Sequence, residues 1–144
     1  MSRRQSFCLP ISTLFLVLLL PVAASAQFSD LDAAMSKLER GFGMGDPVAI
    51  VSGIASDDKV QLQFPGLLDQ SGLFDREKAA YLLALLFDKV HPTACERVSS
   101  KRGRTEGDYN VILEWTISPG ARRLYVTLRQ KDGQYSLVSI HSAG

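Results

Sequence analysis

Few side chains in this sequence belong to the types that carry most enzyme chemistry. The histidines are His91 and His141, and the cysteines are Cys8 and Cys95. His91 and Cys95 are spaced closely enough to ligate one metal ion together, but a structural zinc site takes four ligands. No second pair of histidine or cysteine exists elsewhere in the chain. We therefore predict no metal site, and for Cys95 we expect the role of a small buried hydrophobic side chain.

The candidate residues for general acid–base catalysis are equally weak. Asp57 and Asp58 are adjacent carboxylates, but they follow Ser56 at a break between a short helix and a strand, where exposed turn residues are the usual finding. His91 lies at a helix end and favours a structural role with the helix dipole. His141 would enter the interior only if its strand faced the opposite way from the one we expect. We predict no catalytic residue.

The glycine-rich run GFGMG, residues 41–45, superficially resembles a phosphate-binding loop. It follows a helix rather than a strand and lacks the full G-x-G-x-x-G spacing. We interpret it as a helix stop and hinge, and we expect no cofactor.

The first 26 residues have the pattern of a secretory signal peptide. Arg3 and Arg4 form a basic start, residues 11–20 are apolar, and residues 24–26 read Ala-Ser-Ala, a typical cleavage site. We expect removal of residues 1–26, no membrane span afterwards, and a single domain over residues 27–144 in a secreted or periplasmic protein. Without residues 1–26 the chain carries 14 basic and 15 acidic residues. That balance argues against nucleic-acid binding.

Helical patterns occupy the first half of this domain. Residues 29–42 form an amphipathic stripe beginning at Ser29, and Asp46-Pro47 is a strong start for a second, short helix. The segment 75–90, DREKAAYLLALLFDKV, is the longest helix, with Asp75 as its N-cap and Pro92 just beyond its end. Its wide apolar stripe needs a sheet to cover it.

The second half alternates with the period of a strand. A first strand covers residues 60–64, a weak one covers 94–100, and a three-stranded antiparallel meander occupies residues 109–141, with Asp132-Gly133 as a hairpin turn. One face of the meander is apolar. The other face is mixed, and strict alternation assigns to it the side chains of Ile112, Tyr125, Thr127, Tyr135 and Leu137.

The order of elements resembles that of the nuclear transport factor 2-like (cystatin-like cone) superfamily, and in particular small secreted bacterial domains of unknown function within it. The segments that carry the resemblance are GDPVAIVSGIASDDKVQLQF, DREKAAYLLALLFDKVHP and RLYVTLRQKDGQYSLVSIH. The resemblance implies an α+β fold in which a curved antiparallel sheet wraps around a long helix, with further helices at the N-terminus. A cystatin-like single helix on a curved sheet is the main competing fold, and the helices before Val60 argue against it.

The resemblance also implies a cone-shaped pocket and a homodimer through the open sheet face. We expect Phe64, Phe87 and Trp115 to face the cone, where they could contact a small apolar ligand, and Tyr125, Thr127 and Tyr135 to lie in the dimer interface. The function we predict is a non-catalytic binding or interaction module. The alternative is a small cone-type isomerase or hydratase acting on an apolar molecule, and a structural envelope component with a filled cone is a third possibility.

Overall fold

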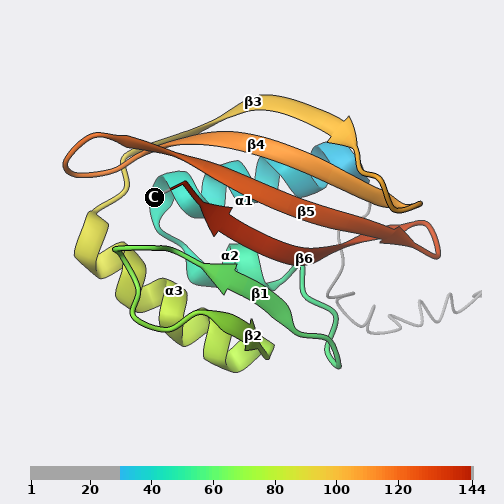
Figure 1. Ribbon diagram of the computed structural model, residues 1–144, viewed down its shortest axis with the longest axis horizontal. Helices are drawn as coiled ribbons and strands as arrows, with labels where there is room; N and C mark the ends of the chain where they lie inside the picture. Colours follow the sequence, from blue (N-terminus) through green and yellow to red (C-terminus); the bar gives the residue numbers. More distant parts are fainter. Residues whose placement is uncertain (1–29, 144) are drawn as a thin grey trace, which may run out of the picture.

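The computed structural model describes residues 30–143, so the predicted signal peptide lies outside the described residues. Within this range the chain forms three helices and six strands (Figure 1). The helices are α1 (Leu31–Met44), α2 (Pro47–Val51) and α3 (Arg76–Val90). The strands are β1 (Val60–Gln63), β2 (Gly72–Phe74), β3 (Ala94–Arg102), β4 (Asp108–Thr116), β5 (Ala121–Lys131) and β6 (Gln134–Ser142).

All six strands belong to one sheet in the order β2-β1-β6-β5-β4-β3. Strands β4 to β6 form the predicted three-stranded antiparallel meander, β3 pairs with β4 and extends it, and β1 and β2 form a short hairpin. The two parts join where β1 pairs with β6, with Leu62 opposite Ile140. This pair is parallel, so the sheet is mixed rather than purely antiparallel.

Helix α3 agrees with the prediction. The side chain of Asp75 accepts a hydrogen bond from the backbone N–H of Lys78 and caps the first turn. His91 ends the helix in the left-handed conformation, with φ of 47°, and its backbone N–H donates to the carbonyl of Phe87. The side chains buried along the helix are those of Ala79, Leu82, Leu83, Leu86, Phe87 and Val90.

Helix α1 differs from the prediction at both ends. Its N-cap is Asp30, whose carboxylate accepts from the N–H of Ala33, rather than Ser29. It also continues through Gly41 and Gly43 and ends only at Gly45, so the glycine run is not a helix stop at its first member. A Cβ on Gly41 would lie 2.6 Å from Ile50 Cγ1, and one on Gly43 would lie 3.2 Å from the backbone nitrogen of Cys95. These glycines let α1 pack closely on α2 and on β3.

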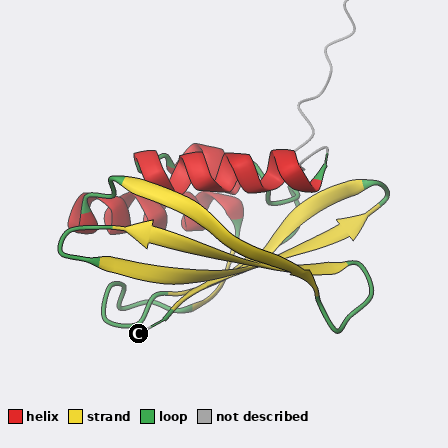
Figure 2. Cartoon of the chain, turned by 90° about the horizontal axis from the view of Figure 1, so that it is seen from above, coloured by secondary structure: helices red, strands yellow, loops and turns green. Residues whose placement is uncertain are grey.

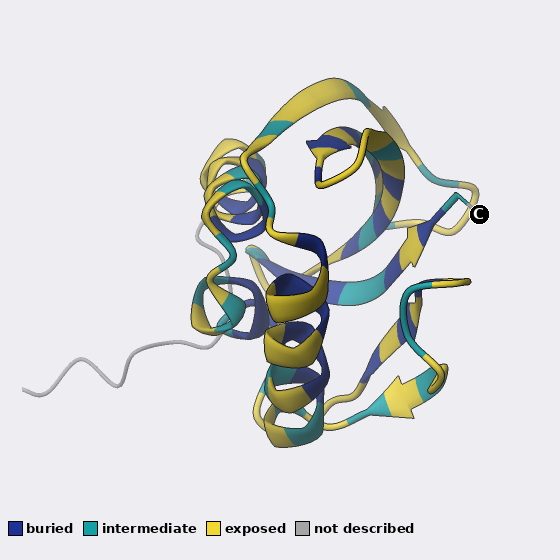
Figure 3. Ribbon diagram, turned by 90° about the vertical axis from the view of Figure 1, so that its left-hand side faces the viewer, coloured by how far each residue is buried: buried dark blue, intermediate teal, exposed yellow. Residues whose placement is uncertain are grey.

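The helices lie on one side of a strongly twisted sheet (Figure 2). Seen from its end, the sheet curls toward the helices, and the helices turn their buried faces to it and their exposed faces outward (Figure 3). This arrangement confirms the predicted α+β cone, with the core between the helices and the inner face of the sheet. Among residues 30–143, no helix has the length and apolar character needed to cross a membrane.

Candidate functional site

Four aromatic rings pack together in the interior of the cone. The indole of Trp115 packs edge to face on Phe42, Phe87 and Phe64, with ring centroids 5.5, 6.1 and 6.3 Å away. Phe42 and Phe87 pack on each other at 5.7 Å. Trp115 is 0% exposed, and its Nε1–H donates to the backbone carbonyl of Phe42 at 2.9 Å. We refer to these four side chains as the aromatic cluster.

The aromatic cluster contains all three residues predicted to contact a ligand. Phe64, Phe87 and Trp115 come from the loop after β1, from α3 and from β4, and the structure brings them together as predicted. Their observed role is packing against one another, while a contact with a ligand stays a prediction. Phe42 joins the cluster although the sequence pattern did not single it out. Its place on the apolar stripe of α1 was the available signal.

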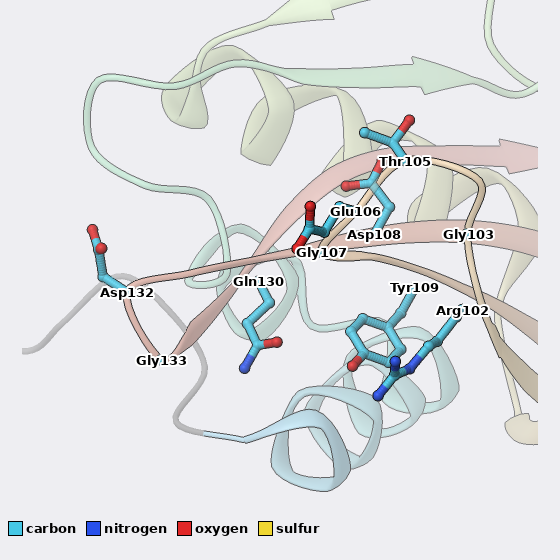
Figure 4. Close-up of a pocket in the computed structure, with 10 residues that line it drawn as sticks. All are labelled: Arg102, Gly103, Thr105, Glu106, Gly107, Asp108, Tyr109, Gln130, Asp132 and Gly133. Atoms are coloured by element: carbon cyan, nitrogen blue, oxygen red, sulfur yellow. The ribbon is translucent and has the colours of Figure 1, made fainter.

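A polar hollow of about 580 Å³ lies at the end of the sheet where the loop between β3 and β4 comes close to the turn between β5 and β6 (Figure 4). Arg102 at the end of β3 and Tyr109 at the start of β4 project from one side of the sheet, and Asp108 projects from the other. Asp108 forms a bidentate ion pair with Arg129, with Nε–Oδ1 and Nη2–Oδ2 distances of 2.8 and 3.2 Å. The negative charge of Asp108 is therefore neutralised within the sheet.

Tyr135 packs inside the cone beside this hollow, where its ring meets that of Tyr109 edge to face at 5.5 Å. Burial raises the pKa of Tyr135, and the hydrogen bond with Tyr109 raises it further. The hydroxyl is therefore protonated at neutral pH and acts there as a hydrogen-bond donor or acceptor rather than as a base.

This position of Tyr135 corrects the prediction that it shares the open face with Tyr125 and Thr127. A β-bulge shifts the register of β6 between the pairs Thr127–Ser139 and Leu128–Leu137. The extra residue reverses the alternation, so Tyr135 and Leu137 face the core, and Tyr135 is only 9% exposed. The adjacent apolar pair Leu137-Val138 breaks strict alternation and was the signal for this bulge.

The outer face of the sheet carries the remaining predicted interface residues. Tyr125 is 41% exposed and packs edge to face on His141, with ring centroids 6.0 Å apart. Thr127 and Ser139 complete a shallow hollow of about 430 Å³ around this pair. His141 therefore lies outside the cone. This agrees with the predicted orientation of its strand, which keeps His141 out of the interior.

The adjacent carboxylates of Asp57 and Asp58 lie in an exposed turn, as predicted. They border a hollow of about 470 Å³ that is also lined by Arg129 and Lys131. Within residues 30–143, no group of three or more histidine, cysteine, aspartate or glutamate side chains is placed to hold a metal ion.

Cys95 is half-buried on the inner face of β3, and His91 is exposed at the end of α3. Burial, with smaller contributions from Glu39 and Glu96, raises the pKa of the Cys95 thiol to about 12. The thiol is therefore protonated at neutral pH, which disfavours nucleophilic chemistry.

Comparison with known proteins finds similarity among solved structures. Neither a known protein family nor a curated protein matches the chain. A DUF4783 family protein from Bacteroides ovatus superposes with a TM-score of 0.63 at 21% identity, over 74% of this chain and 91% of that one. An NTF-2 like protein of unknown function from Silicibacter pomeroyi gives a TM-score of 0.52 at 12% identity, over 78% and 90% of the two chains.

A third structure is described as a hypothetical protein with a ketosteroid isomerase-like fold, from Catenulispora acidiphila, in complex with trimethylamine. It gives a TM-score of 0.54 at 12% identity, over 77% of this chain and 84% of that one. These similarities show the fold, which is the nuclear transport factor 2-like fold that the sequence resemblance predicted. At these identities they carry no activity across to this chain.

Proposed function

We propose that this chain is a secreted or periplasmic, non-catalytic interaction module that pairs with a second copy of itself through the outer face of its sheet. The observation that carries the proposal is that the aromatic cluster is packed in the interior of the cone. Trp115, Phe42 and Phe64 are at most 1% exposed and Phe87 is 6% exposed, so these rings pack within the core and do not line an open pocket. We therefore expect the chain to act through its surface rather than through an internal pocket.

The outer face is the surface best suited to that role. Tyr125 exposes a large ring in the middle of the sheet, beside the partly exposed Ile112 on the neighbouring strand. Exposed aromatic side chains are enriched in protein interfaces, and most homo-oligomers are two-fold symmetric dimers. The compartment rests on the signal-peptide pattern of residues 1–26.

Sedimentation velocity on the mature chain tests the interface. At micromolar concentration we expect the mass of a dimer for the wild type and of a monomer for Tyr125→Glu. Removing the ring and burying an unpaired carboxylate in the interface should raise the dimer Kd about a hundredfold or more. The matched control is Tyr81→Glu, which makes the same replacement at a 56% exposed tyrosine on α3 and should leave the dimer intact.

A monomeric wild type would contradict the proposal, and so would a Tyr125→Glu variant that remains dimeric. Native mass spectrometry of protein taken from the envelope fraction of its host tests the remaining parts. The mass of the chain would show whether it begins at Gln27. A retained small apolar molecule would support a ligand contact of the aromatic cluster and would contradict a purely packing role.

A further inference from the structure

The polar hollow at the end of the sheet has two sides that differ in charge. Arg102 on β3 lies opposite Tyr109 on β4. Tyr109 and Gln130 are each two residues from a buried core side chain on the same strand, which places them on the inner face of the sheet. Figure 4 shows Arg102, Tyr109 and Gln130 extending to the side on which α1 begins, whereas the carboxylates of Glu106 and Asp132 point away from them. The inner side of the hollow therefore carries one cation and two uncharged polar groups.

The cation on this side is the exposed guanidinium of Arg102. It forms no ion pair with another residue of the range 30–143, in contrast to Arg129, which Asp108 binds. Asp30 is the acidic residue whose charge acts on this end of the cone, and its carboxylate caps α1 by accepting from the N–H of Ala33 at 2.7 Å. The positive end of the helix dipole offsets the charge of Asp30 there. An anion beside Arg102 would therefore meet a cation that has no bound counter-ion.

The hydroxyl of Tyr109 supplies a second hydrogen-bond donor. Burial, and then the hydrogen bond with Tyr109, raise the pKa of Tyr135. A hydrogen bond that raises the pKa of a phenol stabilises its protonated form, so the hydroxyl of Tyr135 donates to that of Tyr109. The proton of Tyr109 is then left without an acceptor, because each hydroxyl has one proton and arginine only donates. The charge of Arg102 acts on the same pair of hydroxyls, so the guanidinium lies close to this donor.

We propose that the inner side of this hollow binds a small organic carboxylate, with Arg102 and the hydroxyl of Tyr109 donating to its oxygens. A carboxylate accepts hydrogen bonds and donates none, and its two oxygens match the planar guanidinium. The half-buried ring of Tyr109 offers an apolar wall to the rest of the ligand, and a hollow of about 580 Å³ has the size of a small-molecule site. The inference goes beyond the proposed function, because this site lies on the inner face of the sheet and the proposed dimer uses the outer face.

A phosphate ester is the competing ligand, because arginine binds phosphate and carboxylate alike. At neutral pH a phosphate monoester carries a charge of about −1.5 to −2. The inner side of the hollow supplies one cation, Arg102, and the carboxylate of Asp30 lies near enough to act on the same end of the cone. Charge balance therefore favours a ligand with a single negative charge.

Titration of the mature chain with benzoate, followed by NMR of its backbone amides, tests the site. We expect a Kd of about 1 mM, with the largest shifts at the ends of β3 and β4. Arg102→Gln should raise this Kd about tenfold or more, because it removes charge-assisted hydrogen bonds, and Tyr109→Phe should raise it about threefold or more while keeping the ring. Arg104→Gln is the matched control: it removes the same charge from an exposed arginine in the next loop and should leave the Kd within about twofold of the wild type.

Two probes of the same shape separate charge recognition from unspecific binding. Benzamide has no charge and should bind about tenfold or more weakly than benzoate, and equal binding of the two would overturn the site. Phenyl phosphate that binds more tightly than benzoate would overturn the assignment to a carboxylate. An unchanged Kd in Arg102→Gln, or no shifts at about 10 mM benzoate, would overturn the proposal as a whole.

The result is separable from that of the proposed function. Benzoate should leave the sedimentation of the wild type unchanged, because the hollow and the outer face lie on opposite sides of the sheet. A monomeric wild type that binds benzoate through Arg102 would contradict the proposed dimer and support this site. A dimer whose amides do not respond to benzoate would do the reverse.

Discussion

Replacing Trp115 by phenylalanine tests the filled cone most directly. The change removes the Nε1–H that reaches the carbonyl of Phe42. That carbonyl belongs to the last turn of α1, where carbonyls have no donor within their own helix. Leaving it without a partner in the core costs about 1–3 kcal/mol. The smaller ring also leaves a cavity, which adds about 1 kcal/mol.

The free energy of unfolding should therefore fall by about 2–4 kcal/mol, a large part of the stability of a domain of this size. Urea unfolding followed by far-UV circular dichroism measures the change. Fluorescence would not serve, because Trp115 is the only tryptophan of the chain. With a slope of about 2 kcal/mol per molar urea, in the middle of the usual range for small domains, the midpoint should move by about 1–2 M.

Tyr81→Phe is the matched control, because it removes a polar group from an exposed aromatic ring and should change stability by less than about 0.5 kcal/mol. If Trp115→Phe shifts the midpoint no more than this control does, the cone is not packed as described. An interior that tolerates the loss would have room for a ligand, which would contradict the proposed role of the chain as a surface-acting module.

Two further predictions concern the end of α3 and the thiol. His91→Gly should raise the free energy of unfolding by about 1 kcal/mol in the same urea assay, because φ of 47° suits glycine and strains other residues, and an unchanged or lower value would contradict this cap geometry. Cys95 should react slowly with iodoacetamide at pH 8 in the folded protein, and stability should fall as the pH rises from about 9 toward 12. The unfolded thiol ionises first across that range because burial raises the folded pKa from 9.0 to about 12. The Cys95→Ala variant should lack this alkaline decline, and an equal decline in both proteins would contradict the burial of the thiol.

Local chemistry made much of this fold predictable. Asp75 and Pro92 bound the long helix in the sequence, and the apolar stripe between them correctly indicated its buried face. The alternation of residues 109–128 identified β4 and β5 and their inner faces, because nothing interrupts the pairing of these strands.

The failures have physical causes that act beyond the local sequence. Strict alternation misplaced Tyr135 because one bulged residue reverses every side chain on one side of it. The helix stop predicted for residues 41–45 comes only at Gly45, because glycine propensity alone does not show that β3 passes close to Gly43 inside the helix. The parallel pairing of β1 with β6 depends on contacts between distant segments and has no local signal.

The pairing of Leu62 with Ile140 has a consequence for how the chain folds. Strand β6 follows the other five strands in the sequence, yet it lies in the middle of the sheet, between β1 and β5. Contacts that join such distant segments must wait for a costly loop to close, which makes folding slow compared with that of helical domains of the same length. The sheet also cannot be completed during synthesis before strand β6 has left the ribosome. Deleting residues 134–143 would therefore remove the link between the two halves of the sheet rather than shorten one of its edges.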